Sequence, residues 1–220
     1  MIKLCIFDLD GTALDTLETI AYYGNNALTN HGIEPIEACE YKYLVGTGIS
    51  NLIKNMLNFR QCYTDEAFEK VFHDYDTAYN ADVSYKSRIY DGLRETLDKI
   101  KSLGIELAIV SNKPDYATKE VVNKLYGENY FCYVTGKKEG YPLKPDPTVV
   151  LNLINEKALD KDECVYIGDT STDMLTGKNA GLFTIGVLWG FRGKDELLSN
   201  GADLLAEKPY DLYEYISNKL

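Results

Sequence analysis

The sequence has little cysteine and no pattern that would pair the cysteines it has. The five cysteines are scattered, odd in number and form no Cys-x-x-Cys pair: Cys5, Cys39, Cys62, Cys132 and Cys164. Disulfide frameworks and structural zinc sites need cysteines at characteristic spacings. We therefore expect reduced thiols, as in a cytoplasmic protein, and no zinc site.

Long hydrophobic runs are also absent. The longest nearly apolar segment, Gly181 to Phe191, is far shorter than the roughly 20 residues that a bilayer crossing needs. At the N-terminus, Asp8 and Asp10 interrupt the first apolar run almost at once, so we expect no signal peptide. The sequence thus predicts no membrane partner.

Positive charge is in deficit, with 34 acidic residues against 23 basic ones and a formal net charge of −11. Nucleic-acid binding depends on clustered Lys and Arg, so no nucleic-acid partner is expected. An anionic substrate would be repelled at long range. A site for one would need local positive charge, which a divalent cation supplies most directly.

Apolar residues, in contrast, are plentiful. They make up 45% of the 220 residues, which is enough for a sizeable core. Short apolar runs predict strands at residues 2–7, 105–110, 130–134, 163–167 and 183–187. Helical spacing of apolar residues predicts helices between them, at residues 93–103, 116–125, 148–159 and 173–179. This alternation indicates an α/β fold with a doubly wound parallel sheet, whose site lies beyond the carboxyl ends of the strands.

One segment breaks the alternation. Residues 16–85 contain no convincing strand, and their apolar and aromatic positions favour several helices. We interpret this segment as an inserted all-helical cap, and residues 1–15 and 86–220 as the α/β core. No repeat or Pro/Ser-rich linker divides the chain.

The strongest local signal is Asp8-Leu9-Asp10-Gly11-Thr12, directly after the first predicted strand. Alternate residues of an extended chain point the same way, so Asp8 and Asp10 can reach one small volume. Two carboxylates that close repel each other unless a cation or a shared proton relieves the repulsion. Mg²⁺ would do so, with oxygen ligands from a carboxylate and a backbone carbonyl. Thr12 adds hydroxyl and N–H donors.

Two further signals suit a phosphate. Ser111-Asn112-Lys113 ends the second clear strand and offers a hydroxyl and loop amides, although taken alone the tripeptide fits a strand-to-helix turn with a capping Ser or Asn better. Lys144 precedes Pro145 on a loop stiffened by two prolines, which suits a cation that must hold one position, although it equally suits a solvated lysine beside a helix-starting proline.

The last signal is Gly168-Asp169-Thr170-Ser171-Thr172-Asp173, which follows a predicted strand and leads into a helix. Asp169 could complete a metal site, with Asp173 orienting it. A preference of Asp for helix N-termini would explain Asp173, but it would leave Asp169 without a role.

Together, in this order, the four signals resemble the haloacid dehalogenase superfamily. Asp8 to Thr12 match its first motif, Ser111 its second, Lys144 its third, and Gly168 to Asp173 its fourth. The match covers essentially the whole chain, with the helical insert in the position of that superfamily's small α-helical cap. Within the superfamily, the chain is most similar to the phosphoglycolate phosphatase-like group, which the segment Gly186-Val187-Leu188-Trp189-Gly190-Phe191 also resembles.

The resemblance implies a magnesium-dependent phosphatase that acts through an aspartyl phosphate. Asp8 would be the nucleophile and Asp10 the general acid and base. Mg²⁺ would be held by the Asp8 carboxylate, the Asp10 backbone carbonyl and Asp169, with Asp173 in support. The residues implied to bind phosphate are Thr12, Ser111, Asn112 and Lys144.

The substrate expected is a small phosphorylated metabolite, either 2-phosphoglycolate-like or a sugar phosphate, and the protein is expected to be a monomer or homodimer. Three alternatives stay open. One is a phosphosugar mutase similar to beta-phosphoglucomutase. Another is a nucleotide 5′-phosphatase or pyrophosphatase. The third is a binding or regulatory protein that kept the fold and lost turnover.

Overall fold

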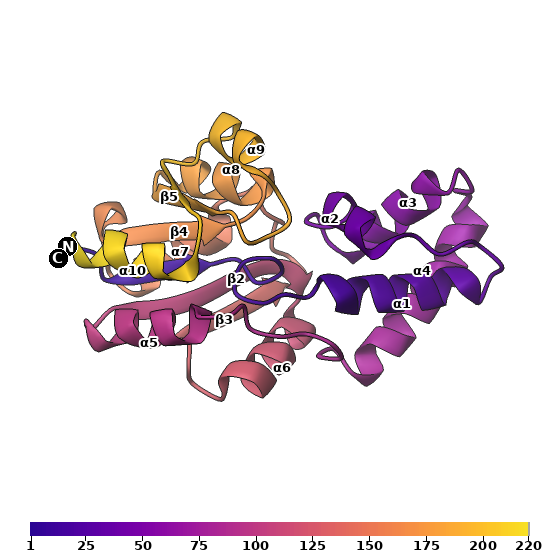
Figure 1. Ribbon diagram of the computed structural model, residues 1–220, viewed down its shortest axis with the longest axis horizontal. Coiled ribbons are helices and arrows are strands. Elements are labelled where there is room, and N and C mark those ends of the chain that lie inside the picture. Colours follow the sequence, from indigo (N-terminus) through magenta and orange to yellow (C-terminus); the bar gives the residue numbers. More distant parts are fainter. Residues whose placement is uncertain (220) are drawn as a thin grey trace.

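A single parallel sheet organises the protein (Figure 1). The computed structural model describes residues 1–219, and across them six strands form this sheet in the order β3-β2-β1-β4-β5-β6. The strands are β1 (Leu4–Phe7), β2 (Glu106–Pro114), β3 (Tyr133–Lys137), β4 (Cys164–Gly168), β5 (Phe183–Val187) and β6 (Leu204–Ala206). Strand β1 lies between β2 and β4, where the strand order reverses. In sheets of this kind the crevice beyond that point is the usual place for a ligand.

Helices fill most of the chain between the strands. In the first half they are α1 (Leu17–Thr29), η1 (Ala38–Glu40), α2 (Tyr41–Leu44), α3 (Ile49–Phe59), α4 (Asp65–Ala81) and α5 (Leu93–Ser102). In the second half they are α6 (Asp115–Tyr126), α7 (Thr148–Glu156), η2 (Lys161–Glu163), α8 (Ser171–Ala180), α9 (Lys194–Ser199) and α10 (Pro209–Ser217). None of the helices within residues 1–219 has the length and hydrophobicity that a bilayer crossing requires.

Both faces of the sheet are covered. Successive side chains of a strand point to opposite faces, so Cys5 and Phe7 join a large apolar cluster that includes residues of α5, α6 and α10. Leu4 and Ile6 join a second cluster with α7 on the other face. The prediction of a doubly wound parallel α/β fold is confirmed.

The segment between β1 and α5 is helical, as its sequence pattern predicts. No strand occurs between residues 16 and 85, and α1 and α3 both pack against α4. Figure 1 shows these helices gathered beyond the carboxyl ends of the strands. At the base, Asp15 and Arg88 exchange two backbone hydrogen bonds, of 2.8 and 3.1 Å. We call residues 16–85 the cap segment and propose that it forms a cap domain.

Some predicted boundaries differ from the structure. Strand β2 extends past residue 110, and its pairing with β3 is irregular between Val110 and Pro114. Strand β3 begins at Tyr133 rather than at residue 130, because Tyr130 and Phe131 pack in an aromatic cluster with Tyr126. The sequence analysis did not identify β6, α9 or α10.

Candidate active site

The ends of the three central strands bring the chemical residues together. Asp8 directly follows β1, and its N–H donates to Ile167 O of β4 at 2.9 Å. Asp169 directly follows β4, and Ser111 belongs to the extended part of β2. Because β1 lies between β2 and β4, residues far apart in sequence meet at one edge of the sheet.

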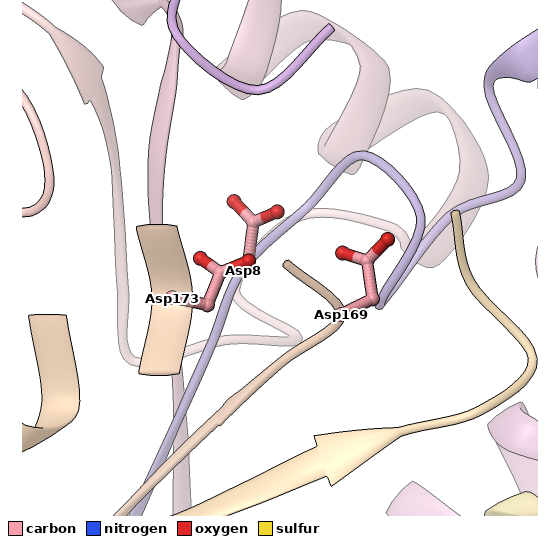
Figure 2. A group of neighbouring side chains, drawn as sticks. All are labelled: Asp8, Asp169 and Asp173. Carbon is pink, nitrogen blue, oxygen red and sulfur yellow. The ribbon is translucent and has the colours of Figure 1, made fainter. Parts of the chain in front are cut away.

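Three carboxylates, two at these strand ends and one from the start of α8, form a buried cluster. Asp8, Asp169 and Asp173 each offer an oxygen, and these oxygens lie within 4.8 Å of one another (Figure 2). Burial, with the charge of Asp173, raises the pKa of Asp8 to about 7. Burial, with Asp173 and Asp8, also raises the pKa of Asp169 well above its usual range. Negative charge is thus in excess at this point.

Lys144 is the cation of the cluster. Its Nζ donates to Asp8 Oδ1 at 2.6 Å and to Asp173 Oδ1 at 2.7 Å, and all three side chains are buried. Burial opposes its charged form, yet Asp173 and Asp8 hold the pKa of Lys144 well above its usual value. Lys144 therefore carries a fixed positive charge beside Asp8.

Asn112 holds the loop that carries Lys144. Its Oδ1 accepts from Lys144 N at 2.9 Å, while its Nδ2 donates to Lys144 O at 3.1 Å. The same Nδ2 lies 3.1 Å from Gly46 O of the cap segment. The side-chain amide of Asn112 is therefore used within the protein, and its predicted contact with phosphate would have to come from its backbone.

Two hydrogen bonds fix the Asp169 carboxylate, and two glycines leave room for its side chain. The Thr12 hydroxyl donates to Asp169 Oδ1 at 2.9 Å, and Phe191 N donates to Oδ2 at 2.8 Å. A Cβ on Gly11, whose φ is +91°, or on Gly190 would collide with the Asp169 side chain. Thr12 is fully buried, so the structure gives its hydroxyl a position that supports Asp169 rather than one on the pocket surface.

Asp173 is fixed by the start of α8. Thr170 N and Oγ1 both donate to Asp173 Oδ2, at 3.1 and 2.6 Å, and Thr170 Oγ1 accepts from Asp173 N. This reciprocal capping explains why a Thr and an Asp stand three residues apart. Because Lys144 takes the other oxygen, Asp173 is well placed to orient Lys144.

Asp10 has a partner that the sequence analysis did not identify. Lys113 Nζ lies 2.7 Å from Asp10 Oδ1 and 3.0 Å from Oδ2. Lys113 follows Ser111 and Asn112, but only the irregular pairing of β2 determines which way its side chain points. In the sequence, only the place of Lys113 beside Ser111 and Asn112 indicated that it could belong to the site.

A pocket lies between these strand ends and the cap segment. On the core side it is lined by Asp8, Asp10, Ser111, Asn112, Lys113, Pro114, Lys144, Thr170, Asp173 and Phe191. On the cap side it is lined by Ile20, Val45, Gly46, Gly48, Ile49, Leu52, Tyr75 and Tyr79. The core wall is therefore strongly polar, whereas the cap wall is mostly apolar.

The carboxylate cluster suits a divalent cation. Lys144 pairs with Asp8 and Asp173, and Asp169 accepts only from neutral donors within the described residues. Carboxylate oxygens are the ligands that Mg²⁺ prefers, and a bound cation would offset the excess negative charge. Asp10 was expected to contribute its backbone carbonyl, so the pairing of its carboxylate with Lys113 does not conflict with that role.

The chain is similar to known proteins over most of its length. The model of the haloacid dehalogenase-like hydrolase family matches residues 5–187. The chain is 32% identical over 189 residues to a phosphoglycolate phosphatase of Agrobacterium fabrum, covering 86% of this chain and 81% of the relative. It is 30% identical to a phosphoglycolate phosphatase of Aquifex aeolicus over 99% of this chain and 98% of the relative.

Solved structures share the whole architecture. A proposed phosphoglycolate phosphatase from Lactobacillus delbrueckii subsp. bulgaricus superposes with a TM-score of 0.91 at 26% identity, over 97% of this chain and 98% of that one. A proposed beta-phosphoglucomutase from Thermotoga maritima superposes with a TM-score of 0.76 at 22% identity over the full length of both chains. At that identity the second likeness concerns the fold alone.

The fold, the acidic cluster with its lysine and these matches define a class of hydrolytic enzyme. The chain belongs to the haloacid dehalogenase-like hydrolase family.

Proposed function

We propose that this protein is a Mg²⁺-dependent phosphatase that hydrolyses the phosphomonoester of a small metabolite through an aspartyl phosphate at Asp8. The observation that carries the proposal is the Asp8 carboxylate, which lies at the floor of a pocket with Lys144 at 2.6 Å and Asp169 and Asp173 beside it. Relatives that match almost the whole chain are named phosphoglycolate phosphatases.

The first step transfers the phosphoryl group to the protein. An oxygen of Asp8 attacks phosphorus, the bond to the leaving oxygen breaks, and Asp10 donates a proton to that oxygen. Lys144 neutralises a phosphoryl oxygen while it keeps Asp8 in place. Ser111, on the same wall of the pocket, donates its hydroxyl to another phosphoryl oxygen.

The second step returns Asp8 to its original state. Asp10 takes a proton from water as the water attacks phosphorus, and the bond from phosphorus to Asp8 breaks, releasing phosphate. Asp8, Asp169 and the Asp10 carbonyl would hold Mg²⁺, and Asp173 would support it. When bound, the ion supplies positive charge that offsets the negative charge of the phosphoryl group.

The pocket favours a substrate with few hydroxyl groups. The cap wall offers apolar side chains and two tyrosines, whereas a sugar carries several hydroxyls that each need a hydrogen-bond partner when buried. We therefore propose a 2-phosphoglycolate-like substrate ahead of a sugar phosphate. A mutase would need the intact sugar to be held in two orientations, and the likeness to the proposed mutase concerns the fold alone.

The test combines a substrate panel with capture of the intermediate. Phosphate release is measured with Mg²⁺ on 2-phosphoglycolate, hexose phosphates, 5′-nucleotides and pyrophosphate. A rapid acid quench with ³²P-labelled substrate should leave a hydroxylamine-sensitive label on the peptide that contains Asp8, and Asp8→Asn should carry none. Conversion of a hexose 1-phosphate without phosphate release would instead support a mutase. A complete lack of turnover would support a binding protein.

A further inference from the structure

Lys113 is a buried cation that the proposed reaction does not use. Its side chain is only 6% exposed, yet it lines the pocket. The lining contains one other cation, Lys144, which Asp8 and Asp173 already occupy. An ammonium group has three donors, and Lys113 is paired with Asp10 alone within the part of the chain that the structure describes.

Tyr79 lines the same pocket and carries a buried hydroxyl. Its side chain is 2% exposed and lines the cavity, and its hydroxyl has no hydrogen-bond partner among residues 1–219. Lys113 Nζ lies 5.3 Å from the centre of the Tyr79 ring. Burial raises the pKa of Tyr79 well above its usual value, so the phenol stays protonated and can donate. A buried donor without an acceptor is unfavourable, and a bound ligand would relieve it.

The chemistry of these two groups indicates what they would bind. An ammonium and a phenol both donate, so the complementary group is an acceptor with negative charge and two oxygens, such as a carboxylate. In the proposed first step Asp10 carries the proton that it donates, so the charge of Lys113, which Asp10 contacts, then matches that of a single carboxylate. A second phosphate, with its greater negative charge, would therefore be poorly neutralised, and the apolar residues of the cap wall could not help.

Asp10 limits where the carboxylate lies on the substrate. In the proposed function, Asp10 protonates the ester oxygen of the leaving group, and Lys113 contacts that same Asp10 at 2.7 Å. A group that binds Lys113 must therefore be only a short spacer away from the ester oxygen.

We propose that Lys113 and Tyr79 form a specificity subsite that binds a carboxylate one carbon away from the phosphate ester oxygen of the substrate. The proposal rests on the proposed phosphatase function and extends it. It assigns selection among substrates to a core lysine and a tyrosine of the cap segment that both line the pocket.

The experiment compares 2-phosphoglycolate with ethyl phosphate, which has a methyl group in place of the carboxylate. The wild-type ratio of their kcat/KM values is expected to favour 2-phosphoglycolate. Lys113→Met should lower this ratio about tenfold to a hundredfold, as expected for loss of a charged hydrogen bond, and Tyr79→Phe by about threefold to tenfold. Circular dichroism and melting temperature check that the variants fold.

Lys119→Met is the matched control, because Lys119 is an exposed lysine that pairs with Asp115 on α6 outside the pocket. It should leave the ratio unchanged. If Lys113→Met lowers kcat/KM equally for both substrates, Lys113 acts only through Asp10 and the subsite is refuted. An unchanged ratio in Tyr79→Phe refutes the role of Tyr79. If the wild-type protein hydrolyses both substrates equally, only the subsite fails. If it hydrolyses no phosphomonoester, the proposed function fails with it.

Discussion

The two walls of the pocket differ in how fully their polar groups are paired. On the core wall, Asp8, Asp173 and Lys144 hold one another through contacts of 2.6 to 2.7 Å. On the cap wall, most side chains are apolar, and Tyr79 keeps a buried hydroxyl without a partner among the described residues. An unsatisfied group of this kind costs about 1–3 kcal/mol. The polar groups of the core wall are therefore paired before a ligand arrives, whereas in our proposal the ligand supplies the partner that the cap wall lacks.

Asp8→Asn should have the largest effect on activity. Loss of the nucleophile should lower kcat on the order of 10⁶-fold, as for other nucleophile deletions. The same change removes one of three buried carboxylates that repel each other, so the melting temperature in metal-free buffer should stay equal or rise. Phosphate release and thermal unfolding measure the two effects. Residual turnover near the wild-type level would refute the role of Asp8.

Lys144→Met should have the largest effect on stability. It leaves Asp8 and Asp173 without their cation, and breaking a buried ion pair in this way costs about 3–5 kcal/mol. Urea unfolding measures the loss. Lys113→Met is the matched control, because its partner Asp10 is partly exposed, at 20%, and can be solvated. Equal losses in the two variants would contradict the view that the core wall is the more tightly coupled one.

Gly190→Ala should weaken metal binding without removing a ligand. The new Cβ would collide with Asp169 and with the Gly11 carbonyl, and displaced ligands typically lose about tenfold to a hundredfold in metal affinity. Isothermal titration with Mg²⁺, or the rise in melting temperature with Mg²⁺, measures it. Gly193→Ala is the control, because nothing lies within 4 Å of a Cβ at that position. A normal affinity in Gly190→Ala would show that Asp169 does not bind the ion.

Ile49→Ala should have the smallest effect, on the cap wall. Ile49 is half-buried and lines the pocket, so its truncation should change kcat/KM by about tenfold or less, and differently for different leaving groups. A substrate panel measures the change in ranking. Ile33→Ala, a half-buried residue of the cap segment outside the pocket lining, is the control. If both variants rank the substrates in the same way, the cap wall does not determine substrate choice.

The core wall could be predicted from the sequence because it depends on strand ends. Short apolar runs identify the central strands, and the carboxyl ends of parallel strands meet at one edge. Asp8, Asp169, Ser111 and Lys144 were all expected at this edge, and the structure brings them together there. Their detailed roles remain predictions.

The other features of the site depend on contacts in three dimensions that the periodicity of the sequence does not indicate. The contact between Lys113 and Asp10 follows from the irregular register of β2 after Val110. The direction of the Thr12 hydroxyl follows from a turn that packs against Asp169. Tyr79 reaches the pocket only because α4 continues to Ala81 and docks beside the strand ends. Each of these depends on contacts between distant parts of the chain.

The central position of β1 also bears on how the protein matures. Asp8 lies within the first ten residues, yet its lysine follows 136 residues later, and β4, which pairs with β1, begins only at Cys164. Contacts of such long sequence separation form late in folding, because a large loop must be closed first. A growing chain on the ribosome therefore cannot pair Asp8 with Lys144 or with its acidic neighbours until most of the core has been synthesised. Competence for phosphoryl transfer should consequently appear together with the completed sheet.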